Sequence, residues 1–312
     1  MSANHTMKQS GLSARIHHEK MEDKKFMKRA YGRLIAIFGL MISGAGVAHG
    51  DIVAKNVKSD LTKAPPLEAF KDAKEETIVL MAQPMAVPRP AATTTAKVFV
   101  RAIHDNDWVA FALRWADSEK SEAGRLAKFS DAVAMQFPVK DHKNPPPIFM
   151  GAKGAPVHIY HWRAQYQLDK EKGVRTIKDL YPNMVADIYP MEFPDMGKLH
   201  EVDEGQREFY SYGRAAGNPQ SYVKKGVDEI LAEGYGTSSV IENVAADANG
   251  VWNAGEWNVV ITRPLKRPGA SELDLGASTF MGFAVWQGGK DEVGSRKSVT
   301  MSWTPLRFES GE

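Results

Sequence analysis

The sequence predicts a mainly β protein, an antiparallel β-sandwich that carries a partly helical, proline-rich insertion. Beyond Asp51, apolar and polar residues alternate in short runs, which is the period of half-buried strands. Residues that favour turns separate these runs, and valine, phenylalanine and tryptophan occupy many of the apolar positions. The pattern is that of antiparallel sandwiches and barrels.

The first 48 residues are predicted to be a signal peptide with an N-terminal extension. Basic residues from Lys24 to Arg33 precede the apolar stretch "LIAIFGLMISGAGVA". This stretch has about 15 apolar and small residues, whereas a membrane span needs about 20. Cleavage is expected after Ala48, with export to the periplasm or an equivalent extracytoplasmic compartment. An uncleaved anchor is the alternative. No stable membrane span is expected in the mature chain.

The remaining chain, residues 49–312, is predicted to form one sandwich domain. "EETIVLMAQPMAVPRP" predicts a strand that ends in a proline-rich turn, and "AKVFVRAIHDNDWVAFALRWAD" predicts a hairpin with its turn near residues 105–107. In the second arm of that hairpin Val109, Phe111, Leu113 and Trp115 share one face. Further strands are expected in "DAVAMQFP", "APVHIYHWRA", "GEWNVVITRPL", "TFMGFAVWQGG" and "RKSVTMSWTPLRF".

Between about residues 165 and 239 the composition changes. Charged stretches and prolines replace the regular alternation, and "SYVKKGVDEILAEG" has the pattern of a helix. The interval has too few alternating apolar runs to build a core of its own. It is therefore predicted to be an insertion on the sheet scaffold.

Composition excludes several classes of function. Lys plus Arg number 40 and Asp plus Glu 38, and the absence of a basic stripe argues against a nucleic-acid partner. The chain has no cysteine, which rules out disulfides, cysteine-bound iron–sulfur clusters and covalent c-type haem. GxSxG, HExxH and P-loop motifs are absent, although composition leaves a Ser/His/Asp triad open.

Two residues stand out as candidate ligands. Met150 follows three prolines in "NPPPIFMG", so its side chain is placed by a restrained loop instead of a strand. Alternation puts Lys297 on the apolar face of Val299, Met301 and Trp303, where an unpaired ammonium is costly. It can snorkel, pair with an acid or lose its proton to become a nitrogen ligand. Core packing is the alternative for Met150.

The histidines are weaker candidates. His158 and His161 are three residues apart on an expected strand, so they point to opposite faces and cannot hold one ion together. Each is expected to be an ordinary hydrogen-bonded or exposed histidine, with a single-ligand role as the alternative.

Several ordered segments resemble one known family. "DAVAMQFP", "PPIFMG", "PVHIYHWRA", "GEWNVVITRPL", "FAVWQGG" and "RKSVTMSWTPL" are similar to the haem-binding gamma subunits of ethylbenzene dehydrogenase, dimethylsulfide dehydrogenase, and selenate and chlorate reductases, and to gamma-type subunits of nitrite oxidoreductases. The resemblance spans roughly residues 75–308, with an interruption at the insertion.

The resemblance implies a β-sandwich that holds one non-covalent haem b between a methionine and a lysine. These ligands fall on Met150 and Lys297, with Met135, Met281 and Lys290 as less suitable rivals. The expected pocket walls are aromatic residues near these segments: Phe149, Trp162, Phe283, Trp286 and Trp303.

The family's role would make this chain a non-catalytic electron-transfer subunit. Its expected partners are the iron–sulfur and molybdenum-cofactor subunits of an oxidoreductase complex and an external carrier such as a soluble cytochrome. Two other readings remain: a carbohydrate- or ligand-binding sandwich module, with Trp252 available to stack on sugars, and a scaffold subunit without haem.

Overall fold

The computed structural model describes residues 50–122, 127–139, 143–173, 181–183 and 226–310. The predicted signal peptide and most of the predicted insertion lie outside these residues. The described helices and strands are β1 (Ile52–Asn56), η1 (Leu67–Phe70), β2 (Glu76–Val79), β3 (Met81–Ala82), β4 (Lys97–His104), β5 (Trp108–Ala116), β6 (Ala132–Pro138), β7 (Val157–Arg163), α2 (Ala164–Lys172), β8 (Val227–Ala232), β9 (Ser239–Val240), β10 (Asp247–Asn253), β11 (Glu256–Pro264), β12 (Thr279–Trp286), η4 (Gly288–Lys290), β13 (Ser298–Val299) and β14 (Thr304–Phe308).

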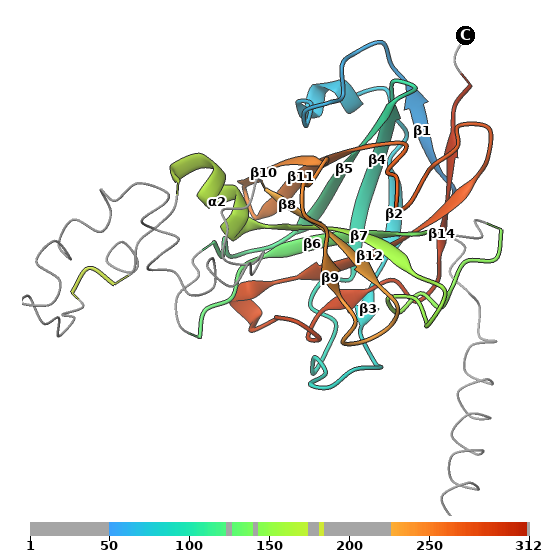
Figure 1. The fold of residues 1–312 in the computed structure, drawn as a ribbon. Helices are drawn as coiled ribbons and strands as arrows, with labels where there is room; N and C mark the ends of the chain where they lie inside the picture. The colour runs from blue at the N-terminus through green and yellow to red at the C-terminus, as the bar shows by residue number, and fades with distance from the viewer. Residues whose placement is uncertain (1–49, 123–126, 140–142, 174–180, 184–225, 311–312) are drawn as a thin grey trace, which may run out of the picture. The chain divides into compact units, whose positions relative to one another are not determined.

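The strands form two layers that share β12. The path of hydrogen-bonded strands runs β10-β11-β5-β4-β1-β14-β12-β6-β7-β8-β9. Residues Thr279–Met281 of β12 pair with β14, whereas its later part, Gly282–Trp286, pairs with β6. Figure 1 shows β4 and β5 crossing the direction of β6, β7 and β12. A strand that passes from one layer to the other is a usual way to close the corner of a sandwich, so the predicted fold class is confirmed.

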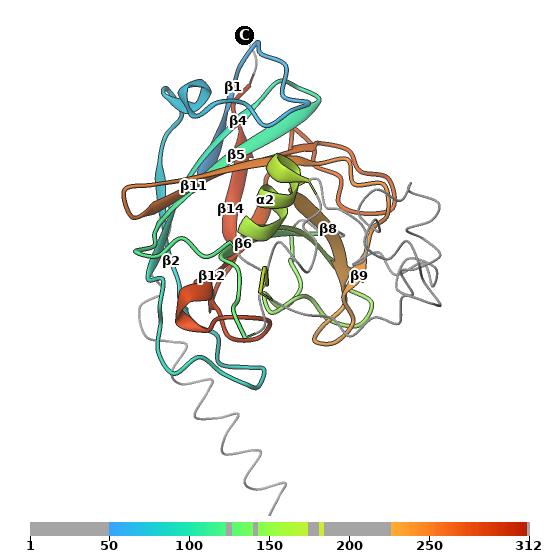
Figure 2. The same cartoon turned by 90° about the vertical axis from the view of Figure 1, so that its left-hand side faces the viewer.

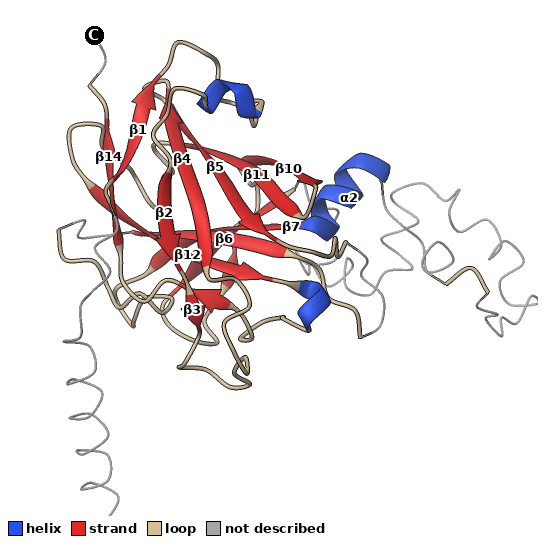
Figure 3. Cartoon of the chain, turned by 180° about the vertical axis from the view of Figure 1, so that it is seen from behind, coloured by secondary structure: helices blue, strands red, loops and turns tan. Residues whose placement is uncertain are grey.

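Most neighbouring strands are antiparallel, as the sequence predicts, but β1 is an exception. It pairs in parallel with both β14 and β4. The predicted hairpin is β4 and β5: Asn106 at its tip has φ +82°, and the Asp105 carboxylate accepts hydrogen bonds from the amides of Asp107 and Trp108. The described helices lie at the periphery of the strands (Figure 3).

Aromatic side chains from both layers meet in the main core. Phe111 of β5 contacts Phe137 of β6, with ring centroids 5.9 Å apart, and Trp162 of β7 lies 5.0 Å from Trp257 of β11. The predicted face of β5 (Val109, Phe111, Leu113 and Trp115) is entirely buried there. Trp162 sits so close to β10 that a Cβ on Gly250 would lie 2.2 Å from its ring.

The predicted helix in "SYVKKGVDEILAEG" is wrong for the part that the structure describes. Residues Val227–Ala232 form β8, which pairs antiparallel with β7. Gly226, with φ +97°, turns the chain into this strand, and pairing with β7 outweighs a local helical pattern. The predicted insertion therefore includes strands of the sandwich. It also includes most of a helix that was not predicted, α2 (Figure 2). This helix directly follows β7 in the chain.

The expected strand from Arg296 to Phe308 is interrupted. Val299 pairs with Ala284, and Thr304 pairs with Met281. The segment from 299 to 304 is therefore two residues longer than the part of β12 that it faces, as in a bulge. The interruption coincides with the passage of β12 between layers. As a result Lys297 and Val299 face the same cavity, but Met301 is 39% exposed and does not continue the apolar stripe.

Candidate functional site

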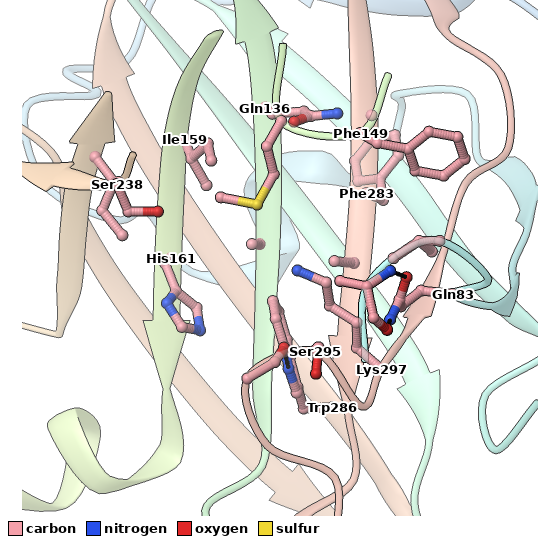
Figure 4. A pocket seen from close by; sticks show the side chains of 18 of the residues that line it. Gln83, Gln136, Phe149, Ile159, His161, Ser238, Phe283, Trp286, Ser295 and Lys297 are labelled. Atoms are coloured by element: carbon pink, nitrogen blue, oxygen red, sulfur yellow. Dashed lines mark hydrogen bonds between the residues drawn. The ribbon is translucent and has the colours of Figure 1, made fainter. Parts of the chain in front are cut away.

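A cavity of about 650 Å³ lies on the face of β6, β7 and β12 that points away from the main core. Its volume is within the range of about 300–1,000 Å³ that is usual for cofactor sites. Loops that contain residues 83–86, 148–150, 235–238 and 294–297 complete the walls. Figure 4 shows labelled side chains from these strands and loops converging on the cavity.

The sheet forms a floor of small residues. Ala134 of β6 lies opposite Ala284 of β12 and His161 of β7, and Gly282 is next along the same face. A Cβ at Gly282 would come within 2.8 Å of Gln136 Nε2 and 2.9 Å of Ile148 Cδ1. Small side chains on the two adjacent strands β6 and β12 leave a flat surface, which suits a planar ligand.

Met150 is presented to the cavity by a well-anchored loop. Its backbone is left-handed, with φ +66°, and it precedes Gly151 with φ +77°. The Met150 carbonyl accepts a hydrogen bond from Gly234 N (2.8 Å), and Gln136 Nε2 donates to the carbonyl of Ile148. A non-glycine residue in this region is uncommon and is often associated with a functional site.

Lys297 extends its ammonium into the same cavity (Figure 4). The nitrogen lies 4.7 Å from the ring centroid of Trp286, whose indole N–H donates to the carbonyl of Gly294. Burial lowers the pKa of Lys297 to about 8. A lysine with so low a pKa yields a neutral amine readily, which is the form that binds metals. Lys290, its rival, is exposed in η4.

The predicted aromatic walls divide into two groups. Phe149, Phe283 and Trp286 line the cavity together with Met150 and Lys297. Trp162 does not, because alternation along β7 turns it into the main core. Trp303 packs beside the cavity, and its indole N–H donates to the carbonyl of Pro146 (2.7 Å), which anchors the loop that carries Met150.

His161 and Arg163 also line the cavity, and sequence reasoning gave neither this role. As predicted, His158 and His161 point to opposite faces of β7. The ring of His161 lies 4.9 Å from that of Trp286, and burial together with the charges of Arg163 and Lys297 lowers the pKa of His161. The useful signal was the alternation of Ile159, His161 and Arg163 on the face opposite the core.

The rival ligands belong elsewhere. Met281 is fully buried in the main core and does not line the cavity. Met135 is also buried in the core cluster, as expected of a strand methionine, although it borders the inner wall of the cavity. Trp252 is partly buried against that core, and its indole N–H donates to the carbonyl of Asp117 (2.9 Å), so it is not a free platform for a sugar. Among the described residues, no group of three or more His, Cys, Asp and Glu is placed to hold a metal ion.

A buried serine, histidine and glutamate lie in contact behind the cavity. His158 Nδ1 is 2.8 Å from Ser271 Oγ, and His158 Nε2 is 3.4 Å from Glu229. All three side chains are inaccessible to solvent, and Arg263 donates to Ser271 Oγ (2.7 Å). A nucleophile needs access to its substrate, so this arrangement serves stability and not catalysis.

Fold and cavity together define a β-sandwich with a largely apolar cavity at the outer face of one layer. A family model described as Ethylbenzene dehydrogenase matches residues 68–298. The chain belongs to this family, as the resemblance implied.

Two relatives match most of the chain. A Haloferax mediterranei protein named as a respiratory nitrate reductase heme subunit is 23% identical over 301 residues, covering 92% of this chain and 87% of its own. The chlorate reductase subunit gamma of Ideonella dechloratans is 23% identical over 249 residues, covering 78% and 79%.

Among solved structures, carbohydrate-binding proteins match this chain at low similarity. A family 9 carbohydrate-binding module from Caldicellulosiruptor kristjanssonii, in complex with cellotriose, has a TM-score of 0.40 and 6% identity and covers 84% of this chain and 94% of its own. A Bacteroides uniformis structure described as a carbohydrate-binding protein has a TM-score of 0.40 and 8% identity and covers 84% and 100%.

Proposed function

We propose that this chain is an electron-transfer subunit that carries one non-covalent b-type haem. The observation that carries the proposal is that Met150 and Lys297, which are 147 residues apart in the sequence, line one cavity. The relatives named as haem and gamma subunits of reductases support the same role. The chain would itself catalyse no bond chemistry.

The residues of the cavity fit this cofactor. A thioether and a low-pKa amine are a soft donor and a nitrogen donor of the kinds that haem iron accepts. The floor of Ala134, Gly282 and Ala284 accommodates a flat macrocycle, and Phe149 and Trp286 supply apolar walls. When bound, a b-type haem accepts and releases single electrons. Met150 and Lys297 would hold the iron, and the apolar walls of the cavity would exclude water from it.

We further propose the setting in which this subunit works. Its partners would be the iron–sulfur and molybdenum-cofactor subunits of an oxidoreductase complex, and an external carrier such as a soluble cytochrome. The basic and apolar N-terminal segment favours export to the periplasm or an equivalent compartment. In the part of the chain that the structure describes, no helix has the length and hydropathy needed to cross a membrane.

Absorption spectroscopy of the purified full chain tests the proposal. After incubation with haem and reduction by dithionite, the protein should give a sharp b-type spectrum, and a pyridine haemochrome assay should count one haem per chain. Met150→Ala and Lys297→Ala should each alter the spectrum. Met281→Ala, which removes a methionine from the main core, and Lys290→Ala, which removes an exposed lysine, should leave it unchanged.

A folded protein that takes up no haem would overturn the proposal. It would favour a ligand-binding module or a scaffold subunit, for which Met150 and Lys297 have no special role.

A further inference from the structure

The cavity is cationic at two places. Arg163, the last residue of β7, lines it at the strand end that leads into α2, and Lys297 lines it from the loop before β13. None of the cavity-lining residues that the structure describes is an aspartate or glutamate. Lys297 loses its charge if its amine binds iron, so Arg163 is the cationic group that remains. A positive charge in a largely apolar cavity without a balancing carboxylate favours a ligand that brings its own negative charge.

The guanidinium of Arg163 packs 5.1 Å from the ring centroid of Tyr166, in the first turn of α2. Among the described residues, no side chain forms a hydrogen bond or an ion pair with it. Asp228 of β8, which lies opposite His161 of β7, accepts a hydrogen bond from the hydroxyl of Tyr166 (2.9 Å). A planar guanidinium fixed on an aromatic ring is well suited to bind a carboxylate through two parallel hydrogen bonds.

His161 provides a second polar group beside Arg163. The two residues are two apart on β7 and therefore share its outer face. His161 Nε2 is buried and has no hydrogen-bond partner. A buried polar atom that borders a cavity and lacks a partner is often completed by the ligand. A neutral imidazole can donate one N–H from this position.

We propose that Arg163, assisted by His161, binds the carboxylates of the porphyrin side chains, so that β7 fixes the in-plane orientation of the macrocycle. The inference rests on the proposed function and adds a specificity determinant to it. Met150 and Lys297 would hold the iron, whereas Arg163 would select a dicarboxylate porphyrin over a neutral one.

A binding cycle with two ligands tests this role. The full-length chain, freed of haem, is titrated with haem and with haem dimethyl ester, in which both carboxylates are neutral, and the Soret absorbance gives each Kd. Arg163→Gln should weaken binding of haem about tenfold to a hundredfold, as expected for loss of a charge-assisted pair. It should leave the Kd of the ester unchanged. His161→Gln should show the same selectivity with a smaller effect.

Matched variants separate contact with the ligand from a structural role. Arg163→Lys should restore part of the affinity for haem, and Arg307→Gln, which removes an arginine paired with Asp51 outside the cavity, should change neither Kd. The inference is overturned if Arg163→Gln weakens both ligands equally, or weakens neither. If the unmodified chain binds neither ligand, the proposed haem function fails as well, so the two failures are distinct.

Discussion

At the residue scale, both candidate ligands occupy positions that cost the folded protein stability. Met150 adopts a left-handed backbone without being glycine, at an expense of about 1 kcal/mol. Lys297 places an ammonium where burial lowers its pKa from 10.5 to about 8. Groups that reduce stability while facing a shared cavity are typical of functional sites.

Replacing Lys297 by methionine should stabilise the haem-free protein. At pH 7 the lysine is charged in both the folded and the unfolded state, so the full cost of burying the charge applies. Lys297→Met should therefore raise the free energy of unfolding by about 3 kcal/mol. Between about pH 8 and 10.5 the unfolded chain binds more protons, the stability of the unmodified protein rises, and the advantage shrinks. Urea unfolding at pH 7 and pH 10 measures this.

Lys290→Met is the control, because Lys290 is exposed and its replacement should leave the free energy of unfolding nearly unchanged. If Lys297→Met is less stable than the unmodified protein at pH 7, the ammonium of Lys297 does not destabilise the folded state, and the prediction is wrong.

At the scale of elements, a buried charge on β8 connects this strand to the loops before β10 and after β11. Glu229 accepts hydrogen bonds from Arg267 (2.8 Å) and from the amides of Ala245 and Ala246, and it lies 3.4 Å from His158. Burial alone would raise the pKa of Glu229, but these partners, His158 first, lower it to about 2. The loop after β9 is thereby fastened to β8.

Stability should therefore fall on acidification. The Glu229 carboxylate stabilises the fold above about pH 4.5, and this contribution is lost as the pH falls from there to about 2. Burial lowers the pKa of His158 below 6.5, so protonating it costs additional stability in acid. Glu229→Gln should destabilise the protein at pH 7 by about 3 kcal/mol and flatten the loss below pH 4.5.

Urea unfolding across this pH range checks the prediction. Glu233→Gln offers a control on the exposed turn after β8. If the free energy of unfolding of Glu229→Gln falls as steeply below pH 4.5 as that of the unmodified protein, groups other than Glu229 cause the acid sensitivity.

At the scale of the whole molecule, the main core and the cavity of the proposed site lie on different faces of the second-layer strands β6, β7 and β12. The inner faces of both layers meet in an aromatic core, whereas the cavity uses the outer face of one layer and loops from four separate parts of the chain. A ligand in that cavity would connect these loops, and the folded state alone can bind it.

Haem should consequently raise the melting temperature of the protein. At a free haem concentration one hundred times its Kd, the folded state gains about 2.7 kcal/mol, which corresponds to about 5 °C or more in a domain of this size. Calorimetry with and without haem measures the shift. The double variant Met150→Ala, Lys297→Ala should show a much smaller shift, and an equal one would contradict ligation by these residues.

Local pattern predicted much of the fold. Alternation identified β4, β5, β6, β7, β11 and β12, because each has one strongly apolar face that must be buried. It failed at β8, where a helix was predicted, since pairing with β7 is a nonlocal interaction that outweighs local preference. It also could not locate the interruption between β13 and β14, which arises where β12 passes from one layer to the other.

The sequence by itself determined that this is a β protein without cysteine chemistry, and it marked Met150 and Lys297 as out of place. Only the tertiary structure decided that these two side chains line one cavity, that Trp162 belongs to the core, and that Arg163 and His161 line the cavity. The physical reason is that composition and period report which face of a strand is buried. Which distant strands and loops enclose a common space depends on how the layers pair and cross.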